Sequence, residues 1–207
     1  TFPGQVPYRA ILPKHIDNLI VPLCVSTSHV GWSTIRLEPT WMNIGEAAGW
    51  ATVLAAHQGV APAQIDSDAL VRALAENHIM VSFFNDVDLG ESDPWIPGVC
   101  YFATKGFFPG YEARADDPLD EATAEIWVKA CAAVLAGTID PMATARQLSA
   151  KDSGGAEVTS RRFSELLAEA GIDGKADSGS KTDRSDALEY VTRGGACRIM
   201  FGALQTK

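Results

Sequence analysis

The fold depends on one stretch of the chain, Cys24-Val-Ser-Thr-Ser-His-Val-Gly-Trp-Ser-Thr-Ile-Arg-Leu-Glu-Pro-Thr-Trp-Met-Asn-Ile-Gly-Glu-Ala-Ala-Gly49. Pro39 suits the first turn of a helix, because the amide hydrogen that proline lacks would have no partner there. Glu38 places a carboxylate beside the positive end of the helix dipole. The stretch therefore predicts a helix N-terminus with free backbone amides, and such a terminus is a ready site for an anion.

We expect this helix to run from about Pro39 to His57 and to end at Gly59, a residue that tolerates the left-handed conformation of a helix end. A Ser/Thr/His loop should lead into it. The apolar run Leu19–Val25 before that loop predicts a short buried strand, and Pro22 limits the strand to an edge or an irregular course.

The rest of the chain predicts mainly helices. The segment Pro7–Pro13 should be extended, Ser82–Pro94, Lys151–Glu157 and Ile172–Asp186 should be loops, and Gly194-Gly195 should interrupt the first turn of the last helix. Apolar spacing and capping residues predict further helices at Asp68–Asn77, Trp95–Lys105, Pro118–Leu135, Ile139–Ser149, Val158–Ala170 and Thr192–Leu204.

Composition excludes some classes of protein. The 207 residues are 46% hydrophobic and 21% charged, as in ordinary globular proteins. The net charge of −9 argues against a nucleic-acid surface, and no apolar run approaches the length of a membrane span. The four cysteines form no CxxC pair, so buried free thiols are favoured, with a disulfide left open. No metal site is predicted, although the acids of the Ser82–Pro94 loop are compatible with calcium as well as with a solvated turn.

The first third of the chain contains an ordered set of residues. The set is Pro7-Tyr-Arg9, Lys14, Asn18-Leu-Ile-Val-Pro22, Ser26-Thr-Ser-His29, Ser33, Arg36, Glu38-Pro39, Met42 and Gly45-Glu-Ala-Ala-Gly49. This set resembles the C-terminal part of FAD-dependent oxidoreductases related to glutathione-reductase-type flavoproteins. In such enzymes this segment is the last piece of the FAD-binding domain, and its helix directs backbone amides at the flavin pyrimidine.

The resemblance implies that Ser28, His29, Ser33, Arg36 and the Glu38-Pro39 turn lie near the flavin. Arg36 would pair with a phosphate or a substrate carboxylate, since its planar fork suits both. His29 would donate a proton to a substrate or to the flavin. The plainer alternatives are a hydrogen-bonded loop histidine and a surface ion pair between Arg36 and Glu38.

The chain departs from this family in two ways. Glu46 stands where the family usually has glutamine, and no strand is followed by the Gly-x-Gly-x-x-Gly turn that binds the FAD pyrophosphate. The resemblance therefore implies a C-terminal fragment, with residues 1–60 closing an FAD-binding domain whose N-terminal region belongs to the same polypeptide. FAD is then the cofactor of the parent protein, and we expect neither tight FAD binding nor turnover by this chain alone.

A second set of residues lies further along the chain. The set is Phe84-Asn-Asp-Val87, Pro94-Trp-Ile96, Tyr101-Phe-Ala-Thr-Lys-Gly-Phe-Phe-Pro-Gly-Tyr111 and Pro118-Leu119, echoed by Val158-Thr-Ser-Arg161 and Val191-Thr-Arg-Gly194. This set resembles one S-layer homology unit, so residues 61–207 are expected to form a helical domain. That family binds cell-wall polysaccharide through a Thr-Arg helix start, which would place the protein outside the cytoplasm or in the cell envelope. Asp120-Glu121-Ala122 replaces this start, whereas Thr192-Arg193 keeps it.

Two other functions stay open for the second region. It is either a binding module for a cell-wall glycan or a protein partner, or a set of helices that braces the oxidoreductase and binds nothing. Its aromatic residues favour a core over a sugar-stacking platform. These residues are Trp95, Tyr101, Phe102, Phe107 and Phe108.

Overall fold

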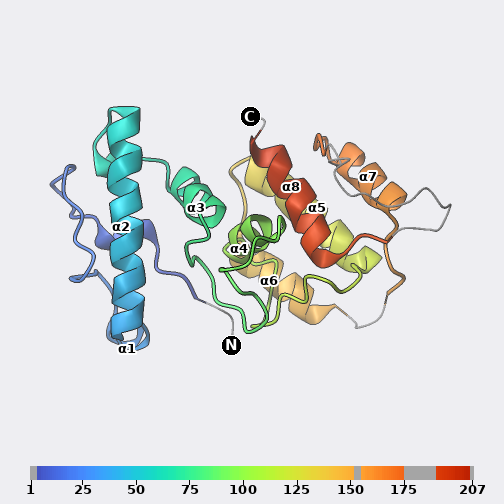
Figure 1. Cartoon of the computed structure of the whole chain (residues 1–207), viewed down its shortest axis with the longest axis horizontal. Helices are drawn as coiled ribbons and strands as arrows, with labels where there is room; N and C mark the ends of the chain where they lie inside the picture. The colour runs from blue at the N-terminus through green and yellow to red at the C-terminus, as the bar shows by residue number, and fades with distance from the viewer. Residues whose placement is uncertain (1–3, 152–154, 175–189, 206–207) are drawn as a thin grey trace. The chain divides into compact units, whose positions relative to one another are not determined.

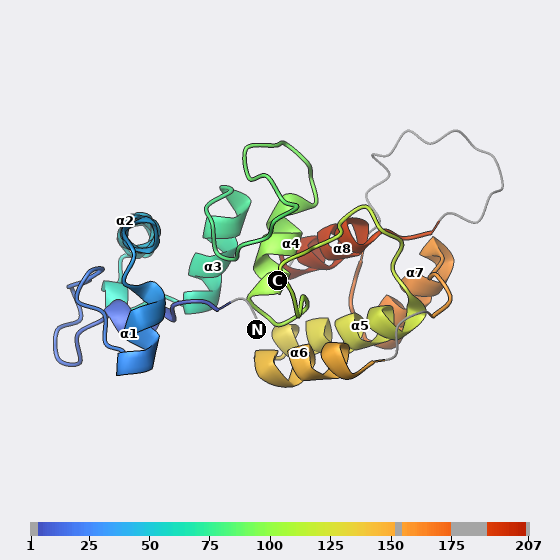
Figure 2. The same cartoon turned by 90° about the horizontal axis from the view of Figure 1, so that it is seen from below.

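The computed structural model describes residues 4–151, 155–174 and 190–205. Within these ranges the chain forms eight α-helices and two 3-10 turns, and its only β pairing consists of isolated bridges (Figures 1 and 2). The predicted mainly α fold is confirmed. None of the described helices is long and apolar enough to cross a membrane.

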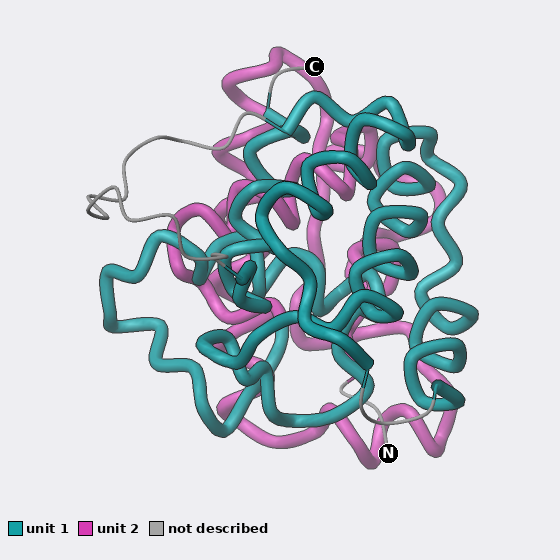
Figure 3. Tube along the Cα trace, turned by 90° about the vertical axis from the view of Figure 1, so that its right-hand side faces the viewer, with its two compact units in different colours: residues 1–3, 82–207 teal, residues 4–81 magenta. Residues whose placement is uncertain are grey.

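The described chain divides into two compact units (Figure 3). Unit 2 comprises residues 4–81, and unit 1 contains the described residues from Ser82 onward. Each unit has its own buried side chains and is described separately below. The predicted domain boundary after residue 60 concerns the organisation of the whole polypeptide and stays a prediction.

The long helix predicted from about Pro39 to His57 is confirmed in unit 2. This helix, α2, runs from Glu38 to Gln58 and buries Ile44, Ala48, Ala51 and Ala55 along one face. Gly59 ends it with a φ of 67°, and its N–H donates to the carbonyls of Ala55 and Ala56. The other elements are η1 (Tyr8–Ile11), α1 (His29–Ile35), η2 (Pro62–Gln64) and α3 (Ser67–Glu76).

Three expectations for unit 2 are wrong. Pro7–Pro13 is not extended throughout, because η1 lies within it. Leu19–Val25 forms no strand and buries only Val25; Pro22 lacks a donor, and only single hydrogen bonds join the segment to the η1 region, such as Val21 N to Ile11 O at 2.8 Å. The loop before α2 contains the short helix α1, which begins at His29.

The helices of unit 1 lie close to their predicted places, and acids or threonines begin most of them. The side chains of Asp120, Asp140 and Thr159 accept backbone N–H groups at the starts of three helices. Parts of the predicted loops Lys151–Glu157 and Ile172–Asp186 fall outside the described residues. The helices are α4 (Ile96–Ala103), α5 (Glu121–Leu135), α6 (Pro141–Ala150), α7 (Ser160–Glu169) and α8 (Arg193–Gln205).

Gly194-Gly195 does not interrupt α8, contrary to expectation. A Cβ on Gly194 would lie 2.9 Å from Cγ of Trp95 and 3.1 Å from Cβ of Ala115. The glycine therefore allows the first turn of α8 to approach these side chains closely. This packing holds the turn in helical form despite the low helix propensity of glycine.

A closed ring of three backbone hydrogen bonds joins the starts of α5, α7 and α8. Leu119 N donates to Val191 O at 2.8 Å, Val191 N to Val158 O at 3.0 Å, and Val158 N to Leu119 O at 2.8 Å. All three residues are buried, and each directly precedes a residue whose side chain caps its helix. The three helix starts that echo one another in the sequence are therefore also neighbours in space.

The core of unit 1 is aromatic and contains thiols. Tyr101, Phe102, Phe107 and Phe108 are buried, so the interpretation of this aromatic group as core is correct, while Trp95 is half-buried. The buried free thiols predicted from sequence are found at three of the four cysteines, and burial raises the pKa of Cys100 to about 11 and that of Cys131 to about 12. The expectation is wrong for Cys24, which is free but exposed.

The close packing of α4 against α8 requires a glycine at position 98. A Cβ at this position would lie 2.6 Å from the carbonyl oxygen of Cys197, which is backbone and cannot swing away. We expect Gly98→Ala to lower the free energy of unfolding by about 1–3 kcal/mol in urea denaturation.

Gly202 supplies the control, because it lies in α8 and a Cβ placed on it would have no neighbour within 4 Å. Gly202→Ala should raise the free energy of unfolding by about 0.5–1 kcal/mol, the usual gain of alanine over glycine in a helix. Equal effects of the two substitutions would contradict the close approach of α4 and α8.

Candidate functional site

The residues expected near a flavin gather around α1 and the start of α2 (Figure 1). Ser28 caps α1, where its Oγ accepts the N–H of Gly31 at 3.1 Å, and His29 is the first residue of that helix. Ser33 Oγ donates to the carbonyl of Val30 at 2.8 Å. Both serines therefore support the local backbone, while the imidazole of His29 belongs to an exposed residue.

The N-terminus of α2 is open. Leu37 occupies the capping position and provides no side-chain hydrogen bond, and the first amide with a helical partner is that of Trp41, at 3.2 Å from Leu37 O. Within the described residues, the amides of Glu38 and Thr40 donate no hydrogen bond. Such amides attract an anion or an electron-rich edge of a ligand.

Charged side chains flank this open terminus. Arg36 closes α1 and Glu38 begins α2, and both are exposed. They form no ion pair with each other among the described residues, so the surface ion pair considered from the sequence is not made. The guanidinium of Arg36 is thus available to a ligand at the helix terminus.

An apolar surface surrounds the same terminus. The rings of Trp32 and Trp41 lie 5.9 Å apart between centroids, and Met42 is 75% exposed. Nε1 of Trp41 is buried and has no hydrogen-bond partner among the described residues. A buried donor without a partner is uncommon, because the donor loses its hydrogen bonds to water on burial.

The outer face of α2 is also open. Nothing lies within 4 Å of a Cβ placed on Gly45 or on Gly49, and both residues are exposed. Ala48 lies on the opposite, buried face. The absence of side chains at these two glycines leaves room for another backbone to approach the outer face of α2 closely.

The arginine of the Thr192-Arg193 helix start is part of the core of unit 1. Its guanidinium carbon lies 5.1 Å from the ring centroid of Trp127 and 5.4 Å from that of Phe108, and Nε donates to Ala113 O at 2.9 Å. Burial lowers the pKa of Arg193 from its usual value. This arginine therefore braces the aromatic core, whereas the side chain of Arg161 at the α7 start is 90% exposed.

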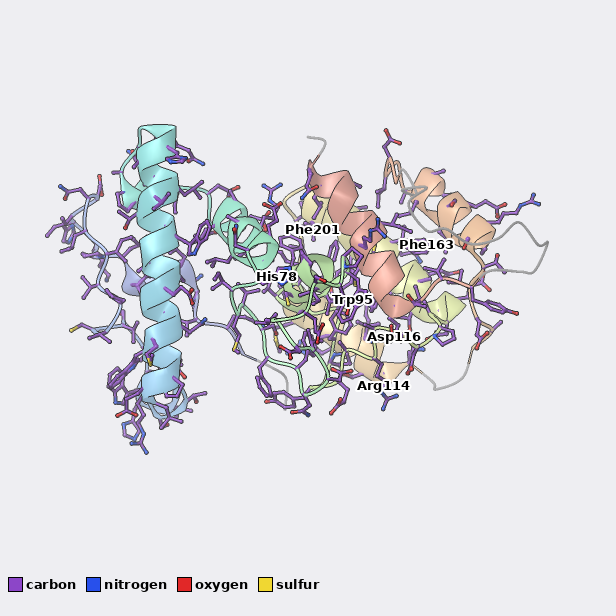
Figure 4. All side chains as sticks on the ribbon, in the orientation of Figure 1. His78, Trp95, Arg114, Asp116, Phe163 and Phe201 are labelled. Carbon is purple, nitrogen blue, oxygen red and sulfur yellow. The ribbon has the colours of Figure 1, made fainter. Side chains whose placement is uncertain are left out.

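Trp95 and Phe201, both labelled in Figure 4, also pack in unit 1. Phe201 of α8 lies 5.3 Å from the ring of Tyr101, and Trp95 covers Gly194. Trp95 is therefore a packing residue at the start of α8.

Two carboxylates of the acidic loop of unit 1 accept backbone amides. Both carboxylate oxygens of Asp86 accept backbone amides, from Ala113 at 2.8 Å and from Arg114 at 2.7 Å. Asp88 accepts the amide of Gly90 at 2.8 Å. Among the described residues no group of three or more His, Cys, Asp or Glu side chains is arranged to hold a metal ion.

Sequence reasoning did not single out Leu37 or Trp41 as parts of the site. The uncapped helix start at Leu37 could have been predicted from the sequence, because an apolar residue directly before Glu38-Pro39 cannot cap a helix. The missing hydrogen-bond partner of Trp41 Nε1 could not have been predicted from the sequence, because it depends on what packs around the indole.

Comparison with known proteins agrees with this region. Residues 3–74 match the model of the family described as FAD dependent oxidoreductase, a match that spans less than half of the chain. No curated protein and no solved structure matches the chain. The first part of the chain is thus a region related to FAD-dependent oxidoreductases, a family whose cofactor is FAD, and it contains all six residues at the α1–α2 junction that were singled out from the sequence.

The open terminus of α2 predicts a gain in stability from a capping residue. Leu37→Ser should raise the free energy of unfolding of unit 2 by about 1 kcal/mol, because a serine oxygen would accept one of the free amides. Urea denaturation followed by tryptophan fluorescence measures this change. No gain, with the fold intact by circular dichroism, would show that these amides already have partners.

Proposed function

We propose that the α1–α2 region is the flavin-edge part of an FAD-binding domain of the glutathione-reductase type. The observation that carries this proposal is the open N-terminus of α2, which lies within the segment related to FAD-dependent oxidoreductases. A flavin ring carries electron-rich carbonyl groups that suit free backbone amides at a positive helix end.

Each residue of the junction has a role under this proposal. The amides of α2, near the Glu38-Pro39 turn, bind the flavin edge, and Arg36 binds a phosphate or a substrate carboxylate. His29 donates a proton to the substrate or to the cofactor. Ser28 and Ser33 position these groups through the backbone of α1.

The residues present fit the flavin in polarity as well as in charge. Met42 and Leu37 offer exposed apolar surface beside the free amides, as the flat, partly apolar ring of a flavin requires. When bound, FAD supplies the electron or hydride transfer of an oxidoreductase. The protein groups described here supply binding, orientation and proton donation.

A second region of protein completes the site under this proposal. The chain contains no Gly-x-Gly-x-x-Gly turn for the FAD pyrophosphate, and the outer face of α2 is open at Gly45 and Gly49. We propose that an N-terminal FAD-binding region of the same polypeptide supplies the pyrophosphate-binding turn and packs on the open face of α2. The chain alone is then inactive and holds FAD weakly, and the parent protein is an oxidoreductase.

Titration of FAD into the 207-residue chain tests this division of the site. We expect no saturable change in flavin absorbance or fluorescence at micromolar FAD. Micromolar or tighter binding with a shifted flavin spectrum would show that the chain builds the whole site, and would contradict the proposal. The coding sequence upstream of Thr1 should specify a strand followed by Gly-x-Gly-x-x-Gly.

Matched variants of the polypeptide that carries both regions test the residues themselves. Arg36→Ala should weaken FAD or substrate binding about tenfold or more, whereas Arg72→Ala, which changes an arginine of α3 in the same unit, should not. His29→Ala should lower kcat with the cofactor still bound, and His15→Ala serves as its control.

A second candidate function is favoured by the ring of hydrogen bonds in unit 1. We infer that unit 1 is a helical binding module of the S-layer homology type, for a cell-wall glycan or a protein partner, in which case the protein belongs to the cell envelope. Three similar helix starts around one ring suit a repeated binding surface. Arg193 is committed to the core, so we assign the exposed contact to Arg161.

Pull-down by purified cell-wall glycan tests this second candidate. Arg161→Ala should reduce retention several-fold, whereas Lys129→Ala, an exposed base on α5, should leave it unchanged. Equal retention of the two variants, or none by the unaltered chain, would leave bracing of the oxidoreductase as the function of these helices.

A further inference from the structure

Phe83 and Tyr111 form an exposed aromatic pair on unit 1. Their ring centroids lie 6.4 Å apart in an edge-to-face arrangement, with Phe83 52% and Tyr111 39% exposed. The neighbouring rings of Phe84 and Phe108 are buried and contact each other at 5.2 Å, so the core does not need the outer pair. Exposed aromatic residues are enriched where proteins bind partners.

The backbone holds this pair in place. Four hydrogen bonds join the loop that carries Phe83 to the loop that carries Tyr111. A partner would therefore find the rings already ordered and would lose little conformational freedom in these loops on binding. The bonds are Asn85 N to Tyr111 O (2.8 Å), Asn85 Nδ2 to Glu112 Oε1 (2.8 Å), Ala113 N to Asp86 Oδ1 (2.8 Å) and Arg114 N to Asp86 Oδ2 (2.7 Å).

The charge of the same two loops selects the partner. A single base, Arg114, stands among the acids of residues 82–94 and 111–117. An anionic ligand would be repelled by this surface, whereas a cationic one would be attracted and guided to it. The acids are Asp86, Asp88, Glu91, Asp93, Glu112, Asp116 and Asp117.

We propose that the Phe83–Tyr111 surface, defined by these two rings with Asn85 and Glu112, binds an arginine- or lysine-bearing segment of another protein. The guanidinium or ammonium group lies over a ring face, and its aliphatic stem covers the other ring. Glu112, directly after Tyr111, supplies the carboxylate. This interaction surface goes beyond the flavin site and does not depend on it.

Unit 1 already uses the same chemistry in its own structure. Lys105 Nζ lies 4.8 Å from the ring centroid of Tyr101, and Arg193 stacks over Phe108 and Trp127. Those rings are occupied by bases of the chain itself. None of the described residues places a base over Phe83 or Tyr111, so these two rings are free for a partner's cation.

Calorimetric titration of the full chain with an octa-arginine peptide tests the proposal. Phe83→Leu combined with Tyr111→Leu keeps apolar side chains and removes both rings, and should weaken binding about tenfold. Glu112→Gln should weaken it about threefold. Tyr190→Ala, which removes a ring that is 45% exposed elsewhere in unit 1, and Asp173→Asn should each change binding by less than about twofold.

A second readout locates the peptide directly. Amide NMR shifts on addition of octa-arginine should concentrate in residues 82–88 and 111–114. Undiminished binding to the double leucine variant would mean attraction by net charge alone, and would overturn the proposal. Absence of saturable binding, or binding of a neutral glycan rather than the peptide at these rings, would overturn it as well.

Discussion

The ring of hydrogen bonds among Leu119, Val158 and Val191 is the constraint on which unit 1 depends. Each bond fixes one helix start against the next, and the side chain that follows each ring residue caps the helix it begins. The ring thereby sets the directions of α5, α7 and α8 from one buried point. Three backbone donors and three acceptors satisfy one another there, as buried polar groups must.

Unit 2 differs from unit 1, because the unit leaves part of the apolar surface of its long helix exposed. α2 buries Ile44, Ala48, Ala51 and Ala55 on one face and leaves glycines and Met42 exposed elsewhere. Its terminus is uncapped, and one indole donor beside it lacks a partner among the described residues. These features share one explanation if a further protein region and a cofactor complete the unit.

Local signals in the sequence were enough to predict α2 and the helices of unit 1. Glu38-Pro39 marks the start of α2 and Gly59 marks its end, and Asp140-Pro141 marks the start of α6. The predicted strand at Leu19–Val25 failed because an apolar run does not reveal whether a second strand lies beside it. The effect of Gly194-Gly195 was misjudged because contacts with Trp95, remote in sequence, decide it.

Local signals in the sequence predict the candidate site only in part. The placement of Ser28, His29 and Arg36 around α1 and the start of α2 follows from their order in the chain, and their roles toward a flavin stay predictions. The short helix α1 has only seven residues and no strong apolar period, so its helical form was missed. Arg193 looked like a ligand-binding base, yet the rings that enclose it come from distant segments.

The same hydrogen-bonded ring also imposes an order on folding. Its members stand at positions 119, 158 and 191, so no pair of neighbouring helices can form it alone. During synthesis α4 and α5 exist before Val191 does, and Tyr101 and Trp127 are not packed against Phe201 and Arg193 until α8 has been made. Contacts so distant in sequence slow folding and prolong the exposure of apolar surface. Because the three helices share one anchor, the packing of unit 1 depends on α8, the last of its helices in the chain.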